Sequence, residues 1–152
     1  MMAIKDKILN DLKEAMKSRQ NERLMVLRSL KAKILEKEIS ERKDGESTLT
    51  EAQITEVLMK AAKQRKESIE QFMQGNREDL AVKERSELTI IESYLPEMMS
   101  EEEIRNAVKK QIESTGAKSV AEMGKVMGPL MATLKGKADG SLISTIVKEE
   151  LS

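Results

Sequence analysis

The chain has 152 residues with 27 basic and 27 acidic side chains, so its formal net charge is zero. It contains no Cys, His or Trp, and its only aromatic residues are Phe72 and Tyr94. These absences exclude disulfides, thiolate zinc sites, cysteine nucleophiles, imidazole metal ligands and a Ser-His-Asp triad. A charged share of 36% with only 7 Gly and 2 Pro favours long helices over a β-sandwich or barrel.

The first 96 residues carry apolar side chains at helical spacing. The pattern predicts about four helices, over residues 4–16, 24–39, 54–72 and 80–95. A polar loop is expected at 43–48, and Thr50 with Gln53 predicts a capping box at the start of the third helix. We therefore expect an N-terminal helical bundle over residues 1–96.

A second domain is expected over residues 97–152. Pro96 disfavours helix at the preceding residue, and three acids at 101–103 suit the first turn of a new helix. About three short helices follow, with Ser119 predicted to begin a second capping box with Glu122, and Ser141 predicted as an N-cap. Pro129 either starts a helix or kinks a continuous one. No segment has a strand pattern, so the fold class is predicted to be all-α.

Neither a membrane span nor a metal site is expected. The longest uncharged run, Val126 to Leu134, has 9 residues, against the roughly 20 that a bilayer requires. The N-terminal residues lack the apolar core of a signal peptide, so a soluble, cytoplasmic protein is expected. No cofactor is predicted, and the 11 methionines are interpreted chiefly as core filler, with a Met-rich docking groove as the alternative.

Two segments are locally basic. Residues 12–33 hold seven basic and two acidic side chains, a net charge of +5, and residues 118–137 hold four and one, a net charge of +3. Such segments either contact phosphates or form a solvated face. Two aromatic residues leave little for base stacking, so any RNA would be recognised by its shape and backbone.

Two glycines, Gly124 and Gly128, lie four residues apart on a predicted helix. Glycine inside a helix costs about 1 kcal/mol relative to alanine. Their presence therefore indicates either close packing within the chain or access for a partner.

Several motifs resemble one known family. Residues 119–128 have the sequence SVAEMGKVMG, residues 135–140 KGKADG and residues 146–148 IVK. These segments resemble the GatB/YqeY domain, which ends the B subunit of the tRNA-dependent amidotransferases that make Gln-tRNA and Asn-tRNA. The N-terminal half resembles stand-alone YqeY-like proteins in ERL at 22–24 with Leu27-Arg28, KQRKES at 63–68, GNREDL at 75–80 and ESYLP at 92–96. The resemblance covers essentially the whole chain.

The resemblance implies an all-helical bundle followed by a small helical tail domain that helps to hold tRNA. The residues that activate the tRNA-bound carboxyl group lie in another domain of the amidotransferase subunit, which this chain lacks. We therefore expect an accessory module that binds tRNA or a tRNA-bound complex and has no catalytic site of its own. Lysines would supply charge and glycines would let phosphate approach the backbone, at Lys118, Gly124, Lys125, Gly128, Lys135, Gly136, Lys137 and Gly140.

Two other hypotheses remain open. The first is a helical module that binds a protein partner and has no RNA role. The second is a glutamine-dependent carbon–nitrogen ligase, which is the activity that the family label implies.

Overall fold

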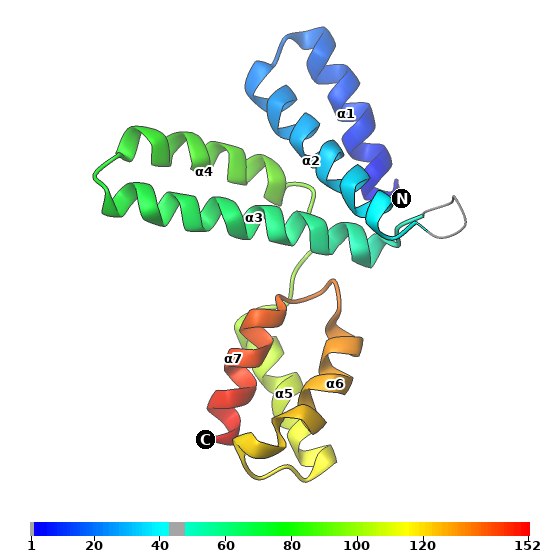
Figure 1. Cartoon of the computed structure of the whole chain (residues 1–152), viewed down its shortest axis with the longest axis vertical. Helices are drawn as coiled ribbons and strands as arrows, with labels where there is room; N and C mark the ends of the chain where they lie inside the picture. The colour runs from blue at the N-terminus through cyan, green and yellow to red at the C-terminus, as the bar shows by residue number, and fades with distance from the viewer. Residues whose placement is uncertain (1, 43–47) are drawn as a thin grey trace. The chain divides into compact units, whose positions relative to one another are not determined.

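The computed structural model describes residues 2–42 and 48–152, so most of the expected polar loop at 43–48 lies outside the described residues. No described residue is in a β-strand, which confirms the all-α prediction. The chain divides into two compact units, Met1–Leu95 and Pro96–Ser152. Each unit is built from helices joined by short connections (Figure 1).

The first unit consists of two helical hairpins. Helices α1 (Ile4–Ser18) and α2 (Asn21–Ser40) form the first, and α3 (Glu51–Gln74) and α4 (Glu78–Glu92) form the second (Figure 1). The capping box predicted for α3 is confirmed: the Gln53 amide donates to Thr50 Oγ1 at 3.2 Å, and the Thr50 amide donates to Gln53 Oε1 at 2.9 Å.

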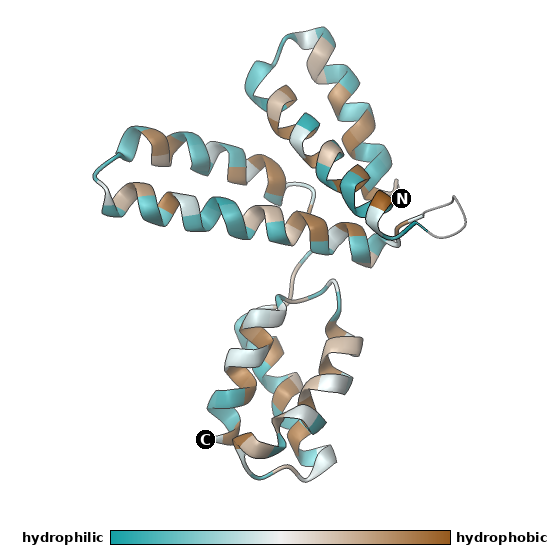
Figure 2. Cartoon of the chain, in the orientation of Figure 1, coloured by the Kyte–Doolittle hydropathy of each residue, from teal (hydrophilic) through white to brown (hydrophobic). Residues whose placement is uncertain are grey.

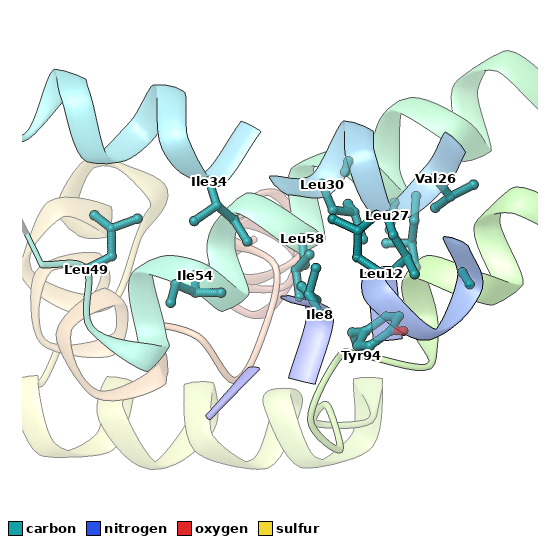
Figure 3. Close-up of a cluster of buried hydrophobic side chains, with 14 residues drawn as sticks. Ile8, Leu12, Val26, Leu27, Leu30, Ile34, Leu49, Ile54, Leu58 and Tyr94 are labelled. Carbon is teal, nitrogen blue, oxygen red and sulfur yellow. The ribbon is translucent and has the colours of Figure 1, made fainter. Parts of the chain in front are cut away.

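The core of this unit contains residues from all four helices and from the segment after α4. Figure 3 shows aliphatic side chains meeting around Leu58, with Leu49 toward one end of the cluster, Val26 toward the other and Tyr94 near Ile8. Ile8 of α1, Leu27 of α2 and Leu58 of α3 are at most 1% exposed. Because hydrophobic and hydrophilic residues alternate along each helix (Figure 2), each helix has an apolar stripe to contribute to such a core.

The second unit contains α5 (Glu101–Thr115), a 3₁₀ turn η1 (Val120–Glu122), α6 (Met123–Leu134) and α7 (Gly140–Leu151). Its core is separate from that of the first unit and contains aliphatic residues from all three α-helices, including Ile104, Val108, Val126, Ile143 and Val147. Pro129 lies inside α6, so it does not begin a helix of its own.

Two predicted helix starts in this unit are wrong. Ser119 forms no side-chain cap, because the amide of Glu122 donates instead to the Ser119 carbonyl at 3.0 Å, which produces the 3₁₀ turn. Ser141 is not the N-cap of α7. Helix α7 begins at Gly140, and Asp139 caps it by accepting a bond from the Ser141 amide at 3.2 Å.

The interpretation of the methionines as core filler is confirmed only in part, because some of them pack at the margin of a core and none lies inside one. None of the methionines that the structure describes is among the buried residues. Met99, Met123 and Met127 lie at the edge of the second core, and Met16 and Met25 are 53% and 62% exposed. Branched aliphatic side chains fill both cores instead.

Candidate nucleic-acid interface

The outer face of α6 is unusually bare. Gly124 and Gly128 are both exposed, and a Cβ atom added at either would meet nothing within 4 Å apart from the adjoining residues of the helix itself. Four residues along a helix bring the two glycines onto the same face, one turn apart. Packing against the rest of the second unit therefore does not explain Gly124, for which access for a partner is the remaining interpretation from sequence. Gly128 has a local reason as well, because it precedes Pro129 inside the helix, where the proline ring disfavours a Cβ on the residue before it.

Four lysines lie near this face. The Lys125 side chain is 69% exposed, and its Nζ lies 3.9 Å from Glu122 Oε2, a loose pair on adjacent turns. Lys118, Lys135 and Lys137 are exposed residues of the two loops that flank η1 and α6. Lysine ammonium groups that remain in water can exchange small counterions for phosphates.

Gly136 lets the chain turn sharply after α6. Lys135 has φ −56° and ψ 127°, Gly136 has φ +76°, and the Lys137 amide donates to the Leu134 carbonyl at 2.9 Å. These values define a type II turn, whose third residue needs a positive φ and is therefore usually glycine. The Lys137 carbonyl accepts a bond from the Met99 amide at 2.9 Å, which fixes the turn against the segment before α5.

Gly140 has a different role from the two glycines of α6. A Cβ atom at this position would lie 3.0 Å from Met131 Cε, so Gly140 allows α6 and α7 to approach closely. The carboxylate of Asp139 already occupies the N-terminus of α7. A helix N-terminus that holds a carboxylate is a poor site for a second anion. This end of α7 therefore contributes helix packing beside the candidate surface and no anion-binding group.

One arginine connects the acidic ends of α5 and α7. Arg105 of α5 bonds to Glu149 and Glu150 of α7 at 2.7 Å each and to Glu101 at 3.2 Å. These carboxylates raise the pKa of Arg105, with Glu149 the largest contributor. These acidic groups lie on α5 and the end of α7, while the candidate lysines lie on α6 and in the loops at its ends. Because Lys109 and Lys110 are also exposed on α5, the surface outside α6 has mixed charge.

The structure places the candidate lysines in two groups, one at each end of α6, and does not gather them at a single point. Helix α6 has 12 residues, a length of about 18 Å. Lys118 and Lys125 lie at or before its first turn, and Lys135 and Lys137 follow its end. Gly124 is next to Lys125, and Gly128 lies one turn further along, between the two groups. This arrangement suits contact along a stretch of nucleic-acid backbone better than the capture of one phosphate.

Sequence reasoning missed the polar contacts of the first unit. Tyr94 Oη donates to Asp11 Oδ2 at 2.6 Å, and Arg23 donates to both, at 3.0 Å to Tyr94 and 3.2 Å to Asp11. Arg65 of α3 pairs with Glu84 and with the buried Glu87 of α4. Arg23, Arg65 and Tyr94 all belong to the segments that resemble the family, and the structure gives them contacts between helices.

A groove of about 470 Å³ lies between α2 and α3. Three lysines, Lys33, Lys37 and Lys60, line it together with Glu36 and Glu56. Burial, with a smaller contribution from nearby Arg65 and Lys60, lowers the pKa of Lys33. The mixed charge of the lining favours no single class of ligand.

Residues 2–42 and 48–152 contain neither a candidate metal site nor a candidate membrane-spanning helix. No cluster of acidic side chains there is arranged to hold a metal ion. None of the helices in these ranges combines the length and the apolar character needed to cross a bilayer.

Comparison with known proteins identifies the family. The model of the family described as Yqey-like protein matches residues 5–151. "Altered inheritance of mitochondria protein 41, mitochondrial" of Pyrenophora tritici-repentis is 33% identical over 144 residues, covering 91% of this chain and 76% of that protein. The protein of the same name from Lachancea thermotolerans is 40% identical over 89 residues, covering 58% of this chain and 46% of its own length.

This chain is also similar to a protein whose name includes tRNA. A glutamyl-tRNA(Gln) amidotransferase subunit of Thermococcus gammatolerans is 38% identical over 72 residues, which is 45% of this chain and 12% of that protein. The chain thus spans about three quarters of the Pyrenophora relative, about half of the Lachancea relative and a small part of the amidotransferase subunit. With a family model matched along nearly its whole length, the chain belongs to the YqeY-like family.

Proposed function

We propose that this chain is an accessory tRNA-binding module that acts through the outer face of α6 and the loops at its two ends. The observation that carries the proposal is the bare face of α6 at Gly124 and Gly128, where a Cβ atom would meet no described residue within 4 Å apart from the adjoining residues of the helix. A helix without side chains on one face lets a phosphate backbone come close. The flanking lysines supply the charge that attracts it.

The relatives and the shape of the surface support this choice of ligand. The amidotransferase subunit that aligns with this chain over 72 residues carries tRNA in its name. The basic groups are spread along α6, which suits recognition of a folded RNA by its backbone and shape. Among the residues that the structure describes, no group of side chains suggests amide transfer, so the module is proposed to assist another enzyme or complex.

Binding of the full chain to total tRNA tests the proposal. Fluorescence anisotropy across a salt series should show an affinity whose logarithm falls linearly with the logarithm of salt concentration. The double variant Lys125→Glu, Lys137→Glu should weaken binding by about tenfold or more and reduce the salt slope by about two phosphate contacts.

A matched control distinguishes an effect of this surface from an effect of the net charge of the chain. Lys109 and Lys110 are exposed on α5 of the same unit, so Lys109→Glu, Lys110→Glu changes the net charge equally and should bind tRNA almost as the unaltered chain does. Absence of binding at low salt, or equal weakening by the two double variants, would contradict the proposal. A protein that remains bound after nuclease treatment would favour the protein-interaction hypothesis instead.

A further inference from the structure

Helix α2 carries apolar residues on two separate faces. One face is buried in the core of the first unit, through Val26, Leu27, Leu30 and Ile34. The other is open to solvent, where Met25 is 62%, Leu35 49% and Ile39 55% exposed. A helix that needs only one apolar face for its own fold has a second one available for a partner.

The exposed residues follow a regular spacing. Met25, Arg28, Ala32, Leu35 and Ile39 are separated by steps of three and four, which is the a and d pattern of a heptad repeat. All five are exposed, and at 100° per residue they fall within an arc of about 80° and run about 21 Å along the helix. We call these five residues the α2 seam.

We propose that the α2 seam binds the same seam of a second copy of this chain, with the two helices antiparallel. The charges beside the seam make it complementary to itself. Lys31 and Glu38 occupy successive positions along one edge, Lys31 beside the N-terminal half and Glu38 beside the C-terminal half. When two such helices run in opposite directions, like edges meet, so each Lys31 faces Glu38 of the other copy.

The direction follows from Arg28, which occupies a seam position. In a parallel pair the two Arg28 side chains would meet at the same level and repel each other. In the antiparallel pair with Ala32 opposite Leu35, Arg28 lies opposite Ile39, where its aliphatic stem covers an apolar group. Such control of helix direction by charge is usual in paired helices.

The Glu38 side chain is 14% exposed and already has a partner within the chain, so only part of its carboxylate can reach a second donor. Lys5 Nζ bonds to Glu38 Oε1, and a carboxylate accepts several donors. The seam has five positions, including one alanine and one arginine, and in this register Met25 lies opposite Arg42, beyond the end of α2, so four positions face one another. The interface is therefore smaller than a standard one of about 1,600 Å², and a dissociation constant in the micromolar range or above is expected.

Sedimentation velocity on the full chain over a concentration series tests the proposal. The unaltered chain should shift from monomer to dimer as concentration rises. Leu35→Glu, which introduces two charges into the interface, should raise the dissociation constant by about tenfold or more. Val82→Glu is the matched control, because Val82 is 60% exposed on α4 of the same unit and lies outside the seam. Circular dichroism should show equal helicity for both variants.

A charge exchange tests the direction of pairing. In an antiparallel homodimer of Lys31→Glu, the carboxylate introduced at position 31 of one copy faces Glu38 of the other copy, and the two negative charges repel each other. Glu38→Lys, combined with Lys5→Glu to preserve the internal ion pair in reverse, opposes its own Lys31. Each variant alone should self-associate more weakly, and an equimolar mixture should recover dimers because both contacts are again between opposite charges.

Three results would overturn the proposal. The first is an unaltered chain that stays monomeric up to about 1 mM. The second is a loss of association with Val82→Glu as large as with Leu35→Glu. The third is a mixture of the two charge variants that associates no better than either alone.

Discussion

Tyr94 is the polar centre of the first unit, and replacing it with phenylalanine should destabilise that unit measurably. The residue is 4% exposed. Its hydroxyl donates to Asp11 of α1 at 2.6 Å and accepts from Arg23 of α2 at 3.0 Å. Tyr94→Phe keeps the ring in the core and removes both bonds, so the segment after α4 loses its polar connection to the first hairpin.

The size of the effect can be worked from the contacts. A hydrogen bond to a charged group contributes about 1.5–3 kcal/mol. The Asp11 side chain is 21% exposed and keeps its pair with Arg23 at 3.2 Å, so the lower end, about 1.5 kcal/mol, is expected. For a unit of this size that corresponds to a decrease in melting temperature of about 6–12 °C.

The same contacts give the variant a pH signature. Burial, and then the hydrogen bond to Asp11, raise the pKa of Tyr94 above its usual value. The folded unit therefore keeps the phenolic proton to higher pH than the unfolded chain does. The stability contributed by Tyr94 is fully present below about pH 10, the pKa of an unfolded tyrosine, and decreases as the pH rises above it. Tyr94→Phe lacks this contribution, so the stability difference between the two proteins should shrink above about pH 10.

The chain has one Tyr and no Trp, so tyrosinate absorbance reports on Tyr94 alone. Chemical unfolding of both proteins at several pH values gives the stability difference, and absorbance gives the titration directly. Equal stability of the two proteins at neutral pH would refute the assigned hydrogen bonds. A stability difference that does not change with pH, together with an ordinary tyrosine titration, would refute the argument about its pKa.

Two further substitutions test other features. Gly124→Ala should stabilise the second unit by up to about 1 kcal/mol, because beyond the adjoining residues of the helix the new methyl group meets nothing within 4 Å; a lower melting temperature would show that the position has a packing role. Arg65→Met should destabilise the first unit by about 2 kcal/mol, because it leaves the carboxylate of Glu87, 8% exposed, without its pair. Unfolding in urea measures this loss, and Arg77→Met, which removes an exposed pair with Asp79, should cost much less.

The helical fold was predictable because it follows from local patterns. Apolar spacing marked the helices, and the sequence of Thr50 and Gln53 was sufficient to predict a capping box. Ser119 and Ser141 show the limit of such motifs. At Ser119 a backbone carbonyl satisfies the amide that the side chain would have bonded, and at α7 a carboxylate two residues before Ser141 takes the capping role. A motif cannot tell which of two nearby acceptors will bind an amide.

Less of the candidate site than of the fold could be predicted from the sequence. Spacing identified Gly124 and Gly128 as unusual, but only the three-dimensional structure showed that no side chain of the unit fills the space beside them. The contact between Asp11 and Tyr94 joins residues 83 positions apart, and no local period encodes it. The exposed seam of α2 was equally hidden, since Leu35 and Ile39 fit the helical pattern whether they face the core or the solvent.

The outward position of the methionines has a consequence for the protein under oxidising conditions. With no cysteine in the chain, methionine is the side chain most readily oxidised, and conversion to the sulfoxide makes it polar. Because branched aliphatic side chains fill both cores, oxidation of the exposed methionines would alter the surface while leaving the folded interior intact. Oxidative damage would thus be expressed first as changed association with other molecules, at sites such as Met25 and Met131, and enzymatic reduction of the sulfoxide would reverse it.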